Sequence, residues 1–205
     1  MKKLVCGIGI NDADYTVEPK ETTGSVGGKL KRRRVWSCPF YRVWVNMIIR
    51  CYSEKALEKN ATYRGCSVSA AWLTFSNFKS WMEQQDYEGK QLDKDLLFPS
   101  NKIYSPETCV FVYQLVNTFV TESNAMRGEW PIGVSWYKAK QQFVARCRNP
   151  FTKRLEHLDY FTCPIEAHEA WLERKLELAE LLAAEQDDPR VAKALVERYE
   201  NYEQS

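Results

Sequence analysis

Three short runs of sequence decide the predicted fold: Ile132-Gly133-Val134-Ser135-Trp136-Tyr137, Gln142-Phe143-Val144-Ala145-Arg146-Cys147-Arg148 and Leu155-Glu156-His157-Leu158-Asp159-Tyr160-Phe161. Each run has the length and the residue types of a β-strand. Alternate residues of a strand point to opposite faces, so the second run separates an apolar face from a basic one. The first face holds Phe143, Ala145 and Cys147, and the second holds Val144, Arg146 and Arg148.

A helix is expected directly after these runs. Pro164 suits a first helical turn, and the residues from there to about Ala184 are rich in Ala, Glu, Leu and Lys. Asn149-Pro150 supplies a turn between the second and third runs. Three strands followed by one helix form a small α+β module, which we predict over residues 132–184. Residues 185–205 then form an acidic end with one short helix.

Residues 36–120 are predicted to form a second domain. Apolar residues recur there at the spacing of a helix face, in two groups. The groups are Tyr41, Trp44, Val45, Ile48 and Ile49, and Phe75, Phe78, Trp81 and Met82. Residues 92–97 resemble a strand, 99–101 a turn and 105–108 the start of a helix, whereas 109–112 suit a strand or a helix equally.

The two remaining segments are expected to lack regular structure. Residues 1–35 form a basic, partly irregular arm, in which glycines around Gly27 precede the run from Lys29 to Arg34. Residues 121–131 form a plausible linker, since they contain Gly128 and few apolar side chains.

The composition is that of a globular protein. Of the 205 residues, 44% are hydrophobic and 27% are charged, which excludes a disordered tail, a collagen-like fibre and a coiled coil. The apolar runs are far shorter than the ~18 residues that span a membrane, so we expect no membrane partner and a cytoplasmic location. The seven cysteines are odd in number and include no CxxC pair, which favours free thiols in a reducing compartment. A zinc site built from Cys51, Cys66 and Cys109 stays open as an alternative.

Charge is distributed unevenly along the chain. Residues 1–35 and 133–163 each carry a net charge of +4, whereas residues 164–205 carry −6. Two basic segments indicate an anionic partner, and a basic run beside glycines, such as Lys31-Arg32-Arg33-Arg34, is typical of contact with a phosphate backbone. Ordinary variation of surface charge would give a similar distribution.

The third section resembles the APETALA/ethylene-response-factor type of DNA-binding domain. The resemblance covers about Gly133–Leu182 and is carried by Gly133-Val134, the run from Phe143 to Pro150, Leu158-Asp159-Tyr160-Phe161 and Glu166-Ala167-His168-Glu169-Ala170-Trp171. It implies a three-stranded antiparallel sheet in the major groove, with one packed helix behind it. The face toward DNA would carry Ser135, Tyr137, Arg146, Arg148, Leu155 and His157, with phosphate contacts from Lys138, Lys140, Lys153 and Arg154. Arginine and tryptophan are usual where this chain has Ser135, Tyr137 and Leu155.

The middle section, about Trp44–Asn117, resembles phage HNH-type endonucleases. The resemblance is carried by Trp44-Val45-Asn46-Met47, Gly65-Cys66-Ser67-Val68, Leu92-Asp93-Lys94-Asp95 and Asn101-Lys102-Ile103-Tyr104-Ser105-Pro106-Glu107-Thr108-Cys109. It implies a ββα fold, here degenerate, in which a histidine activates water and a divalent ion stabilises charge. Asp93 matches the metal-binding acid, Lys94 stands where the histidine would be, and Asn101 matches an asparagine. Asp93, Asp95 and Glu107 are the expected ligands of Mg²⁺.

These expectations define three candidate functions. The first is a phage-type protein that binds double-stranded DNA and descends from an HNH homing endonuclease, with weak or lost nuclease activity. The second is an active, metal-dependent nicking or homing endonuclease. The third is a phage protein that binds and inhibits a host DNA-processing enzyme. If the protein is encoded by a phage, the expected location is the cytoplasm of the host cell.

Overall fold

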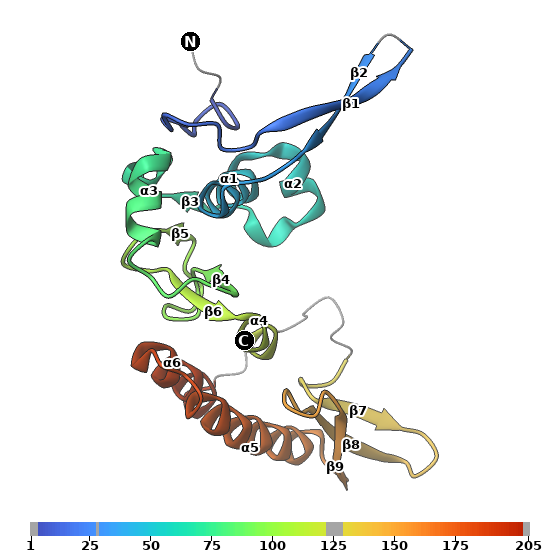
Figure 1. Cartoon of the computed structure of the whole chain (residues 1–205). Helices are drawn as coiled ribbons and strands as arrows, with labels where there is room; N and C mark the ends of the chain where they lie inside the picture. The colour runs from blue at the N-terminus through green and yellow to red at the C-terminus, as the bar shows by residue number, and fades with distance from the viewer. Residues whose placement is uncertain (1–3, 28, 122–128, 203–205) are drawn as a thin grey trace. The chain divides into compact units, whose positions relative to one another are not determined.

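The computed structural model describes residues 4–27, 29–121 and 129–202. The chain forms two compact units, Met1–Phe111 and Val112–Ser205, which we call the N-terminal unit and the C-terminal unit. Figure 1 shows helices and small sheets in both, so the fold is mixed α+β as the sequence indicates. Among the described residues, no helix has the length and apolar content needed to cross a membrane.

Three helices and two short 3₁₀ turns form most of the N-terminal unit. The helices are α1 (Pro39–Tyr52), α2 (Glu54–Lys59) and α3 (Phe75–Met82), and the turns are Ala61–Tyr63 and Ala70–Leu73. The helices expected from apolar spacing at Tyr41–Ile49 and Phe75–Met82 are therefore present. The buried stripe of α1 is rotated from the expected one, since Met47 and Cys51 are buried whereas Ile49 is exposed.

Aromatic side chains fill the core of this unit. The indole nitrogen Nε1 of Trp44 donates a hydrogen bond of 2.7 Å to the carbonyl oxygen of Trp72, which satisfies the one polar atom of the buried ring. The Trp72 ring packs edge-on against Phe78, with 5.0 Å between centroids, and at 4.5 Å from Trp81. The helices are thus fixed through their aromatic faces.

Three two-stranded sheets complete the N-terminal unit. Strands β1 (Lys20–Val26) and β2 (Lys29–Arg34) form an antiparallel hairpin, so the expectation of irregular structure is wrong for this part of residues 1–35. The other pairs are β3 (Ser67–Val68) with β5 (Ile103–Tyr104), in parallel, and β4 (Lys90–Asp93) with β6 (Val110–Tyr113), which spans the boundary between the units.

Two local predictions in this region need correction. The strand expected over residues 92–97 ends at Asp93, because the Asp93 carboxylate accepts hydrogen bonds from the backbone of residues 95 and 96 and turns the chain. The helix expected to begin at residues 105–108 is a turn, closed by the Cys109 N–H bond to the Ser105 carbonyl, and a strand follows it. Strand β5 lies between β4 and β6 in the chain and pairs with β3, and the HNH-like ββα motif remains a prediction.

The C-terminal unit is a three-stranded sheet with helices. Helix α4 (Gln114–Val120) precedes β7 (Val134–Tyr137), β8 (Gln142–Arg148) and β9 (Leu155–Phe161), which are antiparallel in the order β7-β8-β9. Helix α5 (Pro164–Ala183) packs on one face of the sheet, and α6 (Pro189–Glu200) packs on α5. This confirms the predicted sheet with one packed helix, and the predicted short helix near the C-terminus. Most of the expected linker, residues 122–128, lies outside the described residues.

Candidate nucleic-acid interface

The face of the sheet that α5 does not cover gathers the side chains expected to contact DNA. We call it the outer face. Val144 pairs with Ser135 and with Tyr160, and Arg146 and Arg148 pair with His157 and Leu155. Residues that pair across strands point to the same side of a sheet. The outer face therefore holds Ser135, Tyr137, Gln142, Val144, Arg146, Arg148, Leu155, His157 and Tyr160.

A β-bulge in β9 decides which residues of that strand reach the outer face. Ala145 pairs with Asp159, but the next residue, Arg146, pairs with His157, so Leu158 is the extra residue. Simple alternation from His157 would place Asp159 on the outer face. The bulge places Tyr160 there instead, while Leu158 packs against the inner core of Phe143, Ala145 and Ala167, as alternation from His157 also predicts. The outer face therefore carries the aromatic ring of Tyr160 at the point where simple alternation would place the carboxylate of Asp159.

Tyr160 is the centre of a small aromatic cluster on this face. Its ring centroid lies 4.6 Å from that of His157 and 5.5 Å from that of Tyr137. The ammonium of Lys140 lies over the Tyr160 ring, 3.6 Å from its centroid, in cation–π geometry. The cluster joins Tyr137 from β7, His157 and Tyr160 from β9, and Lys140 from the turn after β7. The sequence indicated Tyr137, Lys140 and His157 but not Tyr160, because the bulge leaves no clear signal in the sequence.

The two arginines of β8 differ in how they are held. Arg148 donates a hydrogen bond of 2.9 Å from Nη1 to the carbonyl oxygen of Lys153, which fixes its guanidinium beside the β8–β9 turn. Arg146 is exposed, and its side chain makes no hydrogen bond or ion pair with any residue that the structure describes. Its guanidinium is consequently available to an external acceptor.

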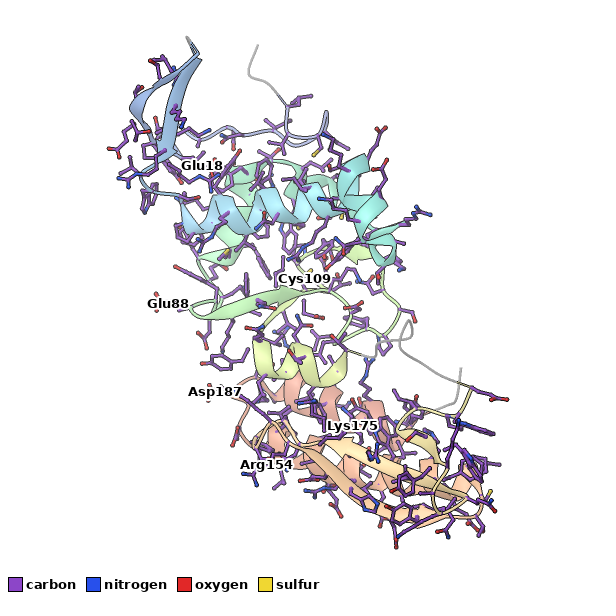
Figure 2. All side chains as sticks on the ribbon, turned by 90° about the vertical axis from the view of Figure 1, so that its right-hand side faces the viewer. Glu18, Glu88, Cys109, Arg154, Lys175 and Asp187 are labelled. Carbon is purple, nitrogen blue, oxygen red and sulfur yellow. The ribbon has the colours of Figure 1, made fainter. Side chains whose placement is uncertain are left out.

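The β8–β9 turn is organised by Asn149. This buried side chain accepts hydrogen bonds from the N–H groups of Phe151 and Thr152 and donates one of 2.7 Å to Glu156. Lys153 has a φ of +58°, a conformation that non-glycine residues seldom adopt. The turn thus holds Lys153 and Arg154 as exposed cations at the end of the sheet, and Figure 2 shows Arg154 there.

Carboxylates are kept away from the outer face. Glu156 points to the opposite side, where Arg174 of α5 donates to it at 2.9 Å. The hydrogen bond from Arg174, and then that from Asn149, lower the pKa of Glu156 below its ordinary value, so it stays ionised inside this network. Within residues 129–202, no cation on or beside the outer face forms an ion pair; these cations are Lys138, Lys140, Arg146, Arg148, Lys153 and Arg154.

A cavity extends this positive surface behind the β8–β9 turn. It has a volume of about 590 Å³ and lies between that turn, α4 and α5. Arg148, Lys153 and Lys175 are among the lining residues, and none of those residues is acidic. The ammonium of Lys175 donates to the Phe119 carbonyl at 2.8 Å and lies 3.6 Å from the centre of the Phe119 ring. Figure 2 labels Lys175 at this place.

The residues matched to HNH catalysis, Asp93, Lys94 and Asn101, lie together in the N-terminal unit. Their side chains make hydrogen bonds that stabilise the loop after β4. The Lys94 ammonium is buried and donates to Asp95 at 2.8 Å and to the Asn101 carbonyl at 2.9 Å. The Asn101 side chain donates back to the Lys94 carbonyl at 2.6 Å. Asp93 Oδ1 accepts two backbone hydrogen bonds, of 2.9 and 2.7 Å. Every one of these groups already has a structural partner.

A metal site is not assembled among the described residues. They contain no group of three His, Cys, Asp or Glu side chains placed to hold an ion, and Glu107 is hydrogen-bonded to Ser105, which lowers its pKa. Burial, and then the neighbouring Asp95, raise the pKa of Asp93. The expected Mg²⁺ ligands Asp93, Asp95 and Glu107 thus lack the geometry of a site, and Mg²⁺ binding remains a prediction.

The proposed zinc ligands behave as buried thiols. Cys51, Cys66 and Cys109 are all buried, and none forms a disulfide. Burial raises the pKa of both Cys51 and Cys109 to about 12, which disfavours the thiolate that zinc requires.

The remaining predicted contacts, Lys31, Arg32, Arg33 and Arg34, lie on β2 of the N-terminal unit. All four side chains are exposed.

Comparison of the whole chain with protein-family models, with curated proteins and with solved structures finds no match.

Proposed function

We propose that this protein binds double-stranded DNA through the outer face of the β7-β8-β9 sheet. The observation that supports the proposal is the segregation of charge: six cations that form no ion pair with any described residue lie on or beside a face whose residues include no carboxylate. Such a surface fits a polyanion, and a regular duplex offers phosphates on both sides of a groove.

The side chains on this face divide into two roles. Arg146 stands in mid-sheet with a free guanidinium, which suits bidentate hydrogen bonds to guanine O6 and N7. Lys138, Lys140, Lys153 and Arg154 lie at the two turns, where the sugar–phosphate backbones on either side of a groove would pass. Arg148 is tied to its turn and suits a phosphate or an edge base pair. The resemblance to ethylene-response-factor domains supports the same orientation of the sheet.

The N-terminal unit is proposed to descend from an HNH endonuclease and to have weak or no nuclease activity. Lys94 occupies the place of the general base, and its ammonium is held by Asp95 and Asn101. A general base contributes about 10²–10⁴-fold to a hydrolytic rate, so its absence leaves at most a trace of nicking. Plasmid incubated with and without Mg²⁺ distinguishes this from the active endonuclease.

A salt titration tests the main proposal. If about five phosphates are neutralised, the logarithm of the affinity falls with the logarithm of salt concentration with a slope of about −4 to −5. Arg146→Ala weakens binding to the preferred sequence by about 1–3 kcal/mol and has less effect on others, whereas Lys138→Ala weakens all sequences alike. Lys193→Ala removes an exposed cation from α6 of the same unit and serves as the control, with no expected change.

The proposal fails if the slope is flat, or if no binding is seen at about 50 mM salt, where electrostatic attraction is little screened. Equal effects of Arg146→Ala and Lys138→Ala on every sequence would reduce the sheet to a charged surface. Capture of a host enzyme without DNA would favour the inhibitor function instead.

A further inference from the structure

The β1–β2 hairpin carries a second surface with the properties of a DNA-binding element. Figure 1 shows it as a two-stranded ribbon that extends from the N-terminal unit. Every side chain described in its strands is exposed, and none belongs to the hydrophobic core. An isolated hairpin is only marginally stable in water, so it gains from a partner along its length.

The base of the hairpin is anchored in the core. The Cys38 N–H donates to the Val17 carbonyl at 2.8 Å, and the Val35 N–H donates to the Pro19 carbonyl at 3.0 Å. Val17 and Cys38 are both buried. The ribbon therefore starts at a fixed point, unlike a disordered basic arm.

Strand register gives the two faces of the ribbon different chemistry. Lys20 pairs with Arg34, Thr22 with Arg32 and Ser25 with Leu30, and these six residues share one face. Beyond Thr22 a bulge shifts the register, so Gly24 pairs with Lys31 on the opposite face, which also holds the pair Glu21 and Arg33. The first face has three cations, two hydroxyls, one apolar side chain and no acid.

Ion pairs leave the first face with free cations. Arg33, on the opposite face, is neutralised by Glu21 at 2.8 Å, and Arg34 at the base contacts Glu18 at 3.0 Å. Lys20 and Arg32 have no ion-pair partner among the residues that the structure describes. The acidic neighbours thus compensate Arg33 on the back and Arg34 at the base of the ribbon. Among the described residues, Lys31 on the back and Arg32 on the front have no ion-pair partner.

We propose that the hairpin enters the major groove of duplex DNA with this first face toward the bases, as a contact separate from the β7-β8-β9 sheet. The inference rests on the proposed DNA-binding function and adds a second contact region to it. The major groove is about 12 Å wide and admits a two-stranded ribbon. Arginine, hydroxyl and small apolar side chains are the groups that read guanine, mixed base edges and the thymine methyl there.

Matched variants on the two faces test this proposal. In the full chain, Arg32→Ala lowers affinity for the selected sequence about 5- to 150-fold, the range of one lost base contact. Arg33→Ala removes the same charge from the opposite face and changes affinity less than about 3-fold, as expected for a surface ion pair. Methylation protection then shows guanine N7 atoms covered at two regions, and Arg32→Ala uncovers only one of them.

The outcomes separate this proposal from the main one. If the full chain binds DNA but Arg32→Ala and Arg33→Ala behave alike, or if one protected region is seen, the ribbon proposal is overturned and the sheet proposal stands. Loss of affinity in Arg32→Ala without any change in N7 protection overturns groove entry, because the ribbon then contacts phosphates only. A circular dichroism spectrum identical to that of the unaltered chain ensures that the variants are folded.

Discussion

Gly133 precedes β7 with a φ of +83°, and its backbone lies directly against the indole of Trp171 on α5. A Cβ at this position would lie 2.1 Å from two atoms of that ring, so both the backbone conformation and the space require glycine. Next to it, the Ile132 carbonyl contacts Nδ1 of the buried His168, whose ring stacks on Trp171. These residues fix the first strand of the sheet on its helix.

Gly133→Ala is accordingly expected to destabilise the protein by about 2–4 kcal/mol, since left-handed backbone strain and overpacking add together. Urea unfolding measures the loss. Gly65→Ala is the matched control, because Gly65 has a φ of +77° with no atom near the added methyl group, and about 1 kcal/mol is expected there. Similar losses in the two variants would show that contact with Trp171 is unimportant.

At the scale of single elements, the bulge in β9 shows where prediction from sequence reaches its limit. The alternation in β8 was sufficient to predict that Arg146 and Arg148 share a face, and register confirms it. It did not reveal Tyr160, because a bulge changes the face of every later residue without changing composition. The same limit applies to β1 and β2, because both strands are polar and lack the apolar alternation by which strands are recognised, and β1 also contains Gly24.

In the loop after β4, the resemblance to HNH endonucleases assigns Asp93 and Asn101 to catalysis. In the structure, both side chains stabilise the loop itself. Asp93 and Asn101 both bind backbone groups, which are invisible in a side-chain motif. Spacing alone identified the residues but not their partners. The buried stripe of α1 was predicted in part, since Trp44 and Ile48 are buried as expected, but neighbouring elements decide which flanking residues are covered.

Asp93→Asn provides a test of this loop. The raised pKa of Asp93, caused first by burial, means that the folded state holds its proton more tightly than the unfolded state. Its stabilising effect is present at low pH and is lost as pH rises through the folded-state pKa, so the charged form opposes folding near pH 7. Asparagine keeps the acceptor oxygen without the charge.

We expect Asp93→Asn to be as stable as the unaltered chain or more so at pH 7, with the advantage decreasing toward acidic pH. Asp93→Ala, which loses two hydrogen bonds, is expected to be less stable by about 1–3 kcal/mol. Urea unfolding across pH, with and without Mg²⁺, measures both. Stabilisation by Mg²⁺ in the unaltered chain but not in Asp93→Asn would instead support the predicted metal site.

At the scale of the whole molecule, each unit has its own distribution of charge. In the C-terminal unit, the outer face is basic, whereas the exposed side of α5 is acidic, with Glu166, Glu169, Glu173, Glu177 and Glu180. Under the proposed DNA-binding function, this asymmetry would orient the unit with its sheet toward the duplex, because phosphates repel the acidic helical side.

The seven thiols offer a test of both units at once. Five are buried: Cys38, Cys51, Cys66, Cys109 and Cys147. Cys6 is exposed and Cys163 partly so, and burial raises the pKa of Cys147 to about 11. We expect two thiols to react quickly with Ellman's reagent in the native protein, and all seven after unfolding. Cys6→Ser should leave one fast thiol; more than two in the unaltered chain would contradict the described burial.

The neighbour order β7-β8-β9 also has a consequence for folding kinetics. Each strand pairs with the next one along the chain, so the sheet closes only short loops and can form on a fast timescale. The N-terminal unit must instead join distant segments, such as Ile10 with Thr74 and Trp44 with Trp72. During synthesis, that unit waits for β6 at residues 110–113 before β4 has a partner, whereas the sheet assembles as soon as its last strand leaves the ribosome.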